Sequence, residues 1–290
     1  MARIGAIFSP YPNPPEAFRE AVTAAEDSGL AELWLWEDCF RTTGFAAASA
    51  ALAWTERLRV GIGIAPMPLR NAALTAMEIA TIDRLFPGRL LPGLGHGVQS
   101  WMSQTDARVA SPLTLMREYV PAVSALLAGD EVTVSGRYVT LDAVRLDWPP
   151  NEPVRVYAAA EGPKTLRLSG EVADGTVLDS RRSPAELATQ IAAVREGRAG
   201  RPGGHDVVAY VVAAFGEGAH ERVRADFAAQ ATVRDPEGRA LTGSVDDVAA
   251  QADAFLAAGV DSLVLLPAAG ETDLPGFFAS AGAVSRVVGA

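Results

Sequence analysis

Residues 59–97 read RVGIGIAPMPLRNAALTAMEIATIDRLFPGRLLPGLGHG and contain a complete strand–helix–strand unit. The runs at 59–65 and 89–95 are apolar on both faces, which is typical of parallel strands that helices cover. Between them, 72–85 has helical spacing and stops at Pro87-Gly88. The stretch therefore predicts a β/α unit of a parallel sheet.

The same alternation runs through the rest of the chain. Six further runs are typical of strands, at 3–8, 32–36, 154–159, 175–179, 207–215 and 261–266. Helical spacing separates them, at 16–28, 45–55, 111–127, 163–172, 184–196, in a region with a break near 236–243, and at the end of the chain. After the fourth β/α unit, two alternating runs in 131–146 predict a small antiparallel insertion around Ser135-Gly136.

Eight strands that alternate with helices predict an α/β protein with one closed (β/α)8 barrel, a TIM barrel, over residues 1–290. No shift in composition marks a second domain. No Gly-x-Gly-x-x-Gly turn follows the first strand, where a dinucleotide-binding open sheet would have it. Active sites of such barrels lie at the carboxyl ends of the strands, so the residues that follow each strand are the candidates for chemistry.

Composition and charge exclude several classes of protein. The 290 residues include 25 basic and 35 acidic ones, and the net charge of −10 argues against nucleic acid as a partner. No apolar run approaches the length of a membrane span, so we expect no membrane association. One cysteine cannot form an internal disulfide, and one cysteine with three histidines does not indicate a four-ligand metal cluster, so we expect no metal, and a reducing cytoplasm fits.

Two groups that can take part in chemistry follow the second strand. Asp38 can accept a hydrogen bond from a cofactor N–H or orient a substrate, and the alternative is a structural role in a turn or helix cap. Cys39 can donate a proton, although free cysteines also serve as small buried apolar residues.

The third and fourth strands both end in glycine-rich sequence. Gly61 and Gly63 predict a β-bulge or a backbone that approaches a flat ligand, and a loose strand end is the alternative. Gly93 and Gly95 predict open room at the barrel mouth. His96 follows them, and its ring nitrogens can bind either an oxygen of a ligand or a loop carbonyl.

The turn AAAEGPK at 158–164 leads from a strand into a helix that has proline in its first turn. The backbone N–H groups that a helix start leaves free favour an anion of phosphate size. Lys164, the only lysine of the chain, can add a positive charge, whereas Glu161 opposes an anion unless it turns to solvent. An ordinary turn is the alternative.

Together these stretches resemble the bacterial luciferase-like family of flavin and deazaflavin enzymes. The matching segments are ELWLWEDCF at 32–40, the stretch at 59–97, VRVYAAAEGPKTLRLSGEVADG at 154–175 and AGVDSLVLLP at 258–267, in the family's order. The resemblance implies a (β/α)8 barrel that binds FMN or coenzyme F420 at its mouth. It also implies a non-prolyl cis peptide bond at Ile62-Gly63 or one bond later.

The resemblance further implies roles for individual residues. Asp38 would contact the deazaflavin head, Ile62, Gly63, Ile64 and Ala65 would lie behind the ring system, His96 and Gly97 would lie near the linker, and Ala160, Glu161, Gly162, Pro163 and Lys164 would hold the cofactor phosphate. Asp38, Cys39 and His96 are the candidate catalytic residues.

Two positions depart from the F420-dependent branch of the family. That branch carries an Asp-His pair after the second strand, where this chain has Asp38-Cys39. Its sugar-phosphate dehydrogenases have an acid after the glycines of the fourth strand, where this chain has Val98. Both departures argue against sugar-phosphate oxidation by that mechanism.

We therefore expect an F420-dependent oxidoreductase that transfers a hydride between the deazaflavin C5 and a small organic substrate. The loops at 100–112 and 131–150 carry no charged cluster, which favours an uncharged substrate. One alternative is an FMN-dependent monooxygenase that uses reduced flavin and O2, and another is a barrel that binds a cofactor without turnover. Many relatives form homodimers, so we also expect a homodimer.

Overall fold

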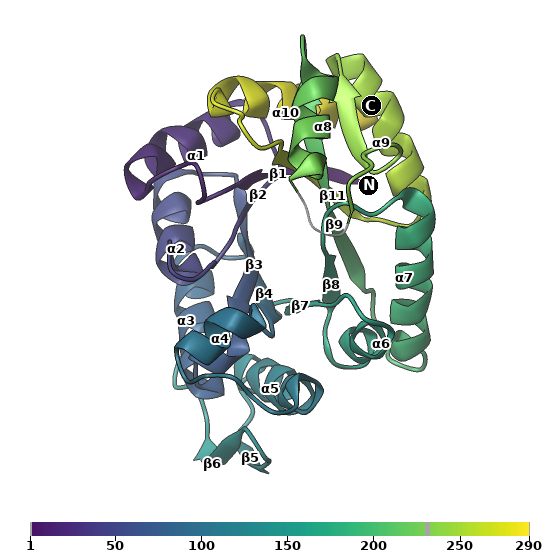
Figure 1. The fold of residues 1–290 in the computed structure, drawn as a ribbon. Helices are drawn as coiled ribbons and strands as arrows, with labels where there is room; N and C mark the ends of the chain where they lie inside the picture. The colour runs from purple at the N-terminus through teal and green to yellow at the C-terminus, as the bar shows by residue number, and fades with distance from the viewer. Residues whose placement is uncertain (1, 230–232, 290) are drawn as a thin grey trace.

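The computed structural model describes residues 2–229 and 233–289, and these contain a closed ring of parallel strands surrounded by helices (Figure 1). The ring strands are β1 (Arg3–Phe8), β2 (Glu32–Leu35), β3 (Arg59–Pro66), β4 (Leu90–Gly95), β7 (Tyr157–Ala159), β8 (Gly175–Leu178), β9 (Asp206–Phe215) and β11 (Ser262–Pro267). They pair in the order β9-β11-β1-β2-β3-β4-β7-β8, and pairing of β8 with β9 closes the ring. The predicted (β/α)8 barrel is confirmed.

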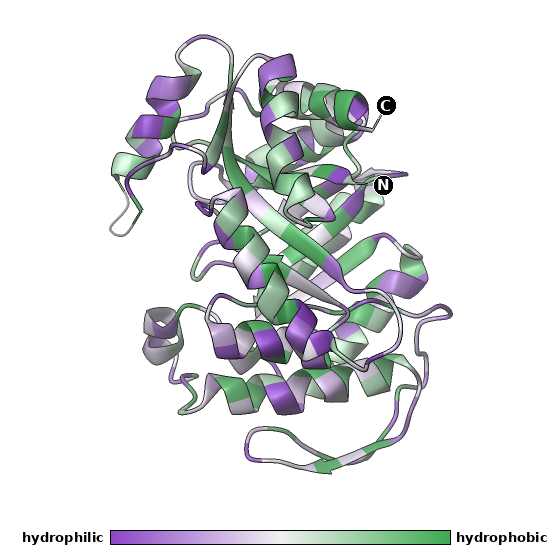
Figure 2. Cartoon of the chain, turned by 90° about the vertical axis from the view of Figure 1, so that its right-hand side faces the viewer, coloured by the Kyte–Doolittle hydropathy of each residue, from purple (hydrophilic) through white to green (hydrophobic). Residues whose placement is uncertain are grey.

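Helices cover the outside of this ring, and the hydrophobic residues are concentrated in the strands (Figure 2). The helices are η1 (Pro15–Ala17), α1 (Phe18–Asp27), α2 (Gly44–Trp54), η2 (Met67–Leu69), α3 (Ala72–Leu85), α4 (Gln99–Gln104), α5 (Pro112–Leu127), α6 (Pro163–Val172), α7 (Pro184–Arg198), α8 (Ala219–Ala228), α9 (Val245–Ala257) and α10 (Leu274–Val288). None of the helices in the described ranges is long and apolar enough to cross a membrane.

Two features outside the ring of strands complete the fold. The predicted antiparallel insertion is confirmed as the pair β5 (Val132–Ser135) and β6 (Thr140–Val144). A further strand, β10 (Ala240–Gly243), was not predicted, because the region near 236–243 reads as a break between helices. The last residues of β9 extend beyond its pairing with β8, and their free edge gives this short segment a partner at 212–215.

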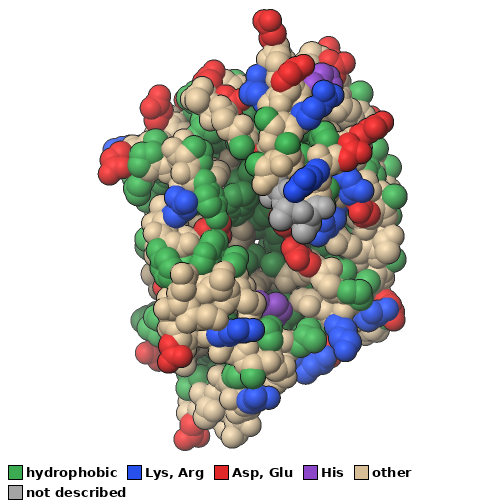
Figure 3. All heavy atoms as spheres, in the orientation of Figure 1, with side chains coloured by type: hydrophobic (Ala, Val, Ile, Leu, Met, Phe, Trp, Pro, Cys, Tyr) green, Lys and Arg blue, Asp and Glu red, His purple; other side chains and the backbone are tan. Residues whose placement is uncertain are grey.

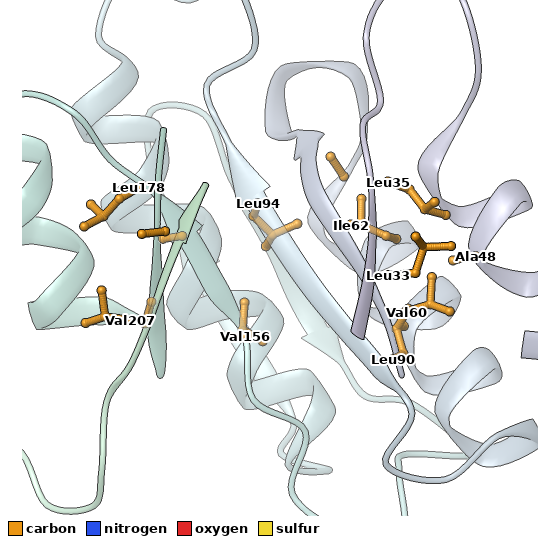
Figure 4. Close-up of a cluster of buried hydrophobic side chains, with 14 of the residues drawn as sticks. Leu33, Leu35, Ala48, Val60, Ile62, Leu90, Leu94, Val156, Leu178 and Val207 are labelled. Carbon is orange, nitrogen blue, oxygen red and sulfur yellow. The ribbon is translucent and has the colours of Figure 1, made fainter. Parts of the chain in front are cut away.

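The strands separate two apolar layers, because successive side chains of a strand point to opposite faces. Outward-facing side chains such as Leu33, Val60 and Ile62 pack toward the helices, where Ala48 of α2 meets them (Figure 4). Inward-facing side chains fill the barrel with a separate cluster that includes Trp34, Tyr157 and Tyr210. We refer to these three rings as the aromatic layer.

The aromatic layer depends on glycine at two inward-facing positions of β3. A Cβ atom at Gly61 would lie 2.2 Å from Cδ2 of Trp34, and one at Gly63 would lie 1.7 Å from Oη of Tyr210. The ring of Trp34 in turn meets those of Tyr157 and Tyr210 at centroid distances of 5.9 and 6.1 Å. Glycine is required here because two large rings occupy the space that side chains of β3 would fill.

Below the aromatic layer, the carboxylate of Glu32 joins four neighbouring strands. Glu32 is 1% exposed and accepts hydrogen bonds from Arg3 of β1 and Arg59 of β3. It also accepts from Nε1 of Trp34 at 3.0 Å and from Oγ of Ser262 in β11 at 2.6 Å. A buried carboxylate with four donors is well satisfied, so it stabilises this end of the barrel.

Replacing Glu32 with glutamine should therefore destabilise the fold strongly. The Glu32→Gln variant leaves the guanidinium of Arg59 without its counter-charge and leaves Arg3 with only Asp206, so we expect a loss of about 3 to 5 kcal/mol in the free energy of unfolding, measured by urea denaturation. Glu196→Gln is the control, because it breaks an exposed ion pair with Arg167 and should cost less than about 1 kcal/mol. Equal losses for the two variants would contradict this role of Glu32.

Candidate functional site

A cavity of about 610 Å³ lies at the carboxyl ends of the strands. Its walls come from the last residues of β3, from residues at or after the ends of β2, β4, β7 and β8, from Trp101 of α4 and Thr165 of α6, and from Tyr210 of the aromatic layer. In the orientation of Figure 1, the hollow opens toward the viewer near the centre of the molecule, with acidic side chains and a histidine close to it (Figure 3). The cavity thus occupies the position predicted for the site.

Most of the residues predicted for the site line this cavity. Those that do are Asp38, Gly63, Ile64, His96, Gly97, Ala160, Glu161 and Gly162. Cys39, Ile62, Ala65, Pro163 and Lys164 are absent from the described lining. Ile62 and Ala65 are buried in the outer apolar layer instead, and Lys164 is exposed on α6.

The β3 wall of the cavity contains the predicted bulge. Pairing between β3 and β4 changes register between Ile62 and Ala65, and the peptide bond Gly63–Ile64 is cis, at the second of the two predicted positions. A further cis bond, Cys39–Phe40, was not predicted. The expectation of open room at Gly93 and Gly95 is wrong, because a Cβ atom would lie 2.4 Å from the backbone oxygen of Ile62 at Gly93 and 2.7 Å from Cδ1 of Ile64 at Gly95.

Asp38 lies at the cavity in a hydrogen bond that was not predicted. The Tyr11 hydroxyl, from the loop after β1, donates to Oδ2 of Asp38 at 2.8 Å, and the guanidinium of Arg41 lies 4.2 Å from the centre of the Tyr11 ring. Burial raises the pKa of Asp38, the Tyr11 hydrogen bond and Arg41 lower it, and the charge of Asp179 raises it further. Burial and the Asp38 carboxylate raise the pKa of Tyr11 to about 12, so Tyr11 stays a donor.

Glu37 also lines the cavity, but its charge is compensated. Its carboxylate accepts from the backbone N–H of Gly44 at 2.6 Å and forms an ion pair with Arg70, whose Nη2 lies 3.0 Å from Oε2. The side chain is 6% exposed. Glu37 therefore fixes the start of α2 against η2 and contributes little net charge to the cavity.

Two polar side chains in the cavity wall have no hydrogen-bond partner in the described part of the chain. Both ring nitrogens of His96 and the hydroxyl of Tyr210 are buried without a hydrogen bond to any described residue. Burial lowers the pKa of His96, so the imidazole is neutral, and burial raises that of Tyr210. A buried polar group without a partner costs about 1 to 3 kcal/mol, so these atoms indicate a place that a ligand completes.

The start of α6 forms another part of the wall. Gly162 precedes Pro163 and makes no side-chain cap, so the first backbone N–H groups of the helix are free to bind. Thr165 lines the cavity, whereas Lys164 does not. Glu161 lines the cavity beside Asp179, and burial together with the Asp179 carboxylate raises the pKa of Glu161.

The barrel, the bulge in β3 and the cavity at the strand ends can be compared with those of known enzymes. The chain matches the model of the luciferase-like monooxygenase family over residues 1–232. It belongs to this family.

Two individual relatives and one solved structure are similar to this chain. The chain is 30% identical over 188 residues to a 5,10-methylenetetrahydromethanopterin reductase of Methanolobus tindarius, covering 64% of this chain and 57% of the reductase. It is 31% identical over 218 residues to an F420-dependent glucose-6-phosphate dehydrogenase of Beutenbergia cavernae, covering 69% and 63%. The matches thus span less than two thirds of these relatives. The fold is shared with an F420-dependent secondary alcohol dehydrogenase solved with an F420-acetone adduct, with a TM-score of 0.84, 22% identity and 99% coverage of both chains.

The surroundings of Asp38 give a testable dependence of stability on pH. The pKa of Asp38 in the fold lies above its usual value of 3.8, so the native state binds more protons than the unfolded state in that interval. Stability therefore falls as pH rises through the interval, because ionised Asp38 is disfavoured in the fold. Asp38→Asn removes this penalty and keeps an acceptor for Tyr11.

We expect Asp38→Asn to unfold at a higher temperature than the original protein at pH 7, and the advantage to disappear as pH falls below the unfolded pKa of Asp38. Scanning calorimetry over a pH series measures this. Asp253→Asn, at an exposed position of α9, is the control and should show no such trend. A constant difference at all pH values would show that burial does not perturb Asp38.

Proposed function

We propose that the protein is an F420-dependent oxidoreductase that transfers a hydride between the deazaflavin C5 and a small organic substrate. The carrying observation is the bulged Gly63–Ile64 wall of the cavity, which lies beside the unpartnered ring nitrogens of His96. A cofactor whose ring system lies against this wall would give His96 a partner. The F420-dependent relatives at about 30% identity support the choice of cofactor.

The residues around the cavity fit such a cofactor at three places. Gly63 and Ile64 would contact the ring system, with Ile62 and Ala65 behind them, and Asp38 would contact its head. His96 and Gly97 would lie near the linker. When bound, the deazaflavin supplies the hydride chemistry, and the protein supplies position and polarity.

The cofactor phosphate would bind at the start of α6, through free backbone N–H groups near Gly162 and through Thr165, which sequence reasoning did not single out. Ala160, Glu161, Pro163 and Lys164 form the rest of this segment. Glu161 opposes the phosphate, because it faces the cavity. The backbone N–H groups must therefore outweigh one carboxylate.

The second candidate function is an FMN-dependent monooxygenase that uses reduced flavin and O2. The family match favours it, because the family is described by that activity. We further propose that residues 1–290 act as one barrel domain, in the cytoplasm and as a homodimer, without nucleic acid or membrane as partner. The excess of acidic residues and the single cysteine support this setting.

A cofactor titration separates the two functions. We expect F420 to bind, with a change in its fluorescence that saturates at one equivalent, and FMN to bind at least tenfold more weakly. Oxygen uptake with reduced flavin should stay at the background rate. Tight FMN binding without a response to F420 would overturn the assignment in favour of the monooxygenase.

Two substitutions test the proposed roles of individual residues. His96→Ala should weaken F420 binding about tenfold, which corresponds to one lost hydrogen bond of about 1.4 kcal/mol. Gln104→Ala, at an exposed position at the end of α4, is the control and should bind normally. Turnover by Cys39→Ala tests the remaining catalytic candidate. Unchanged turnover in both His96→Ala and Cys39→Ala would remove the catalytic roles and leave the fold assignment intact.

A further inference from the structure

We propose that the substrate bound in this cavity is an organic cation, such as a protonated or quaternary amine, whose positive charge is held by Asp38, Glu161 and Asp179. The inference deepens the proposed function and rests on it for the statement that the bound molecule is a substrate. The binding of a cation, however, can be tested without any cofactor.

The charges that face the cavity are unbalanced. Among the described residues of its lining, Glu37, Asp38, Glu161 and Asp179 are acidic and none is lysine or arginine. The ion pair with Arg70 compensates Glu37. Three carboxylates remain, with Asp38 partly buried and Glu161 and Asp179 exposed, and like charges that face one space repel each other.

These three carboxylates act on one another across the cavity. The charge of Asp179 raises the pKa of both Asp38 and Glu161. Two guanidinium groups offset part of this repulsion, since Arg41 lowers the pKa of Asp38 and Arg182 lowers that of Glu161. Neither arginine belongs to the cavity lining, so the space between the carboxylates holds no protein cation in the described part of the chain.

Tyr210 gives a second and independent indication of a ligand. Its side chain is 5% exposed, it lies in the cavity wall, and its hydroxyl has no partner among the residues at 2–229 and 233–289. The oxygen can accept a hydrogen bond from an ammonium group. The rings of Trp36, Trp101 and Tyr210 also line the cavity, and aromatic faces attract organic cations.

The arrangement suits an organic cation better than the other ligand classes. A metal ion needs several donors around one point, and the described residues contain no group of three or more acidic, histidine or cysteine side chains arranged to hold one. An anionic substrate would add its charge to those of the three carboxylates and of the proposed cofactor phosphate, and a neutral one would leave the repulsion unchanged. The expectation of an uncharged substrate came from two loops, whereas these carboxylates follow β2, β7 and β8.

A matched pair of probes tests the inference. Choline and 3,3-dimethylbutan-1-ol have nearly the same shape and differ in charge, because a quaternary nitrogen replaces a quaternary carbon. Isothermal titration of the purified protein, first alone and then saturated with F420, should show that choline binds at least tenfold more tightly than the neutral alcohol. Equal affinities, or no measurable binding of choline, would overturn the proposal.

Single substitutions test whether the preference for choline over the neutral alcohol comes from the cavity. Asp179→Asn and Glu161→Gln should each reduce choline affinity at least threefold and leave that of the alcohol unchanged. Asp253→Asn changes the net charge equally at an exposed site on α9 and should have no effect. The same loss in all of the charge variants would overturn the proposal, because it would reflect net charge alone.

The choline titration and the cofactor titration can fail independently of each other. Preference for choline with no response to F420 would refute the proposed function and support the cation site. Binding of F420 with no preference for choline would support the proposed function and refute the cation site.

Discussion

The rings of Trp34 and Tyr210 fill the space that Gly61 and Gly63 leave on the inner face of β3, and the cavity depends on this packing. Large rings in the middle of a barrel close it to through-passage, so space for a ligand remains only at its ends. The bulge after Gly63 then bends the β3 backbone into the cavity wall. The β3 stretch thus leaves the space that the aromatic rings fill and also forms one wall of the site.

The polar groups on the two sides of this aromatic layer differ in whether they have hydrogen-bond partners. Below it, the Glu32 carboxylate has four donors from four strands, so a buried charge serves stability. Above it, His96 and Tyr210 lack hydrogen-bond partners among the described residues, and three carboxylates line the same cavity. Such unsatisfied and repelling groups lower stability and are typical of sites that are completed by a ligand.

The sequence allowed the barrel to be predicted because each strand and helix carries its own period and stop signals. The short strand β10 was missed because it needs the free end of β9 as its partner, and no local pattern reports that end. The cis bond at Gly63–Ile64 was foreseen from the family resemblance.

Prediction of the site was limited by contacts that cross the barrel. Asp179 follows β8, so the rule that functional residues follow the strands of such barrels could have identified it. Tyr210 lies in the middle of β9, and its role depends on a ring that reaches the Gly63 backbone on the far side. Tyr11 reaches Asp38 from another loop in the same way. Contacts of this kind depend on how the closed barrel brings distant strands and loops together, and no short stretch of sequence reports them.

The most direct test of the account is a crystal structure of the protein with F420. The account predicts that the deazaflavin ring lies in the cavity against Gly63 and Ile64, with a polar atom within hydrogen-bond distance of His96 and the phosphate at the start of α6. Electron density for the cofactor at any other surface of the barrel, or a ring system remote from the β3 bulge, would contradict it.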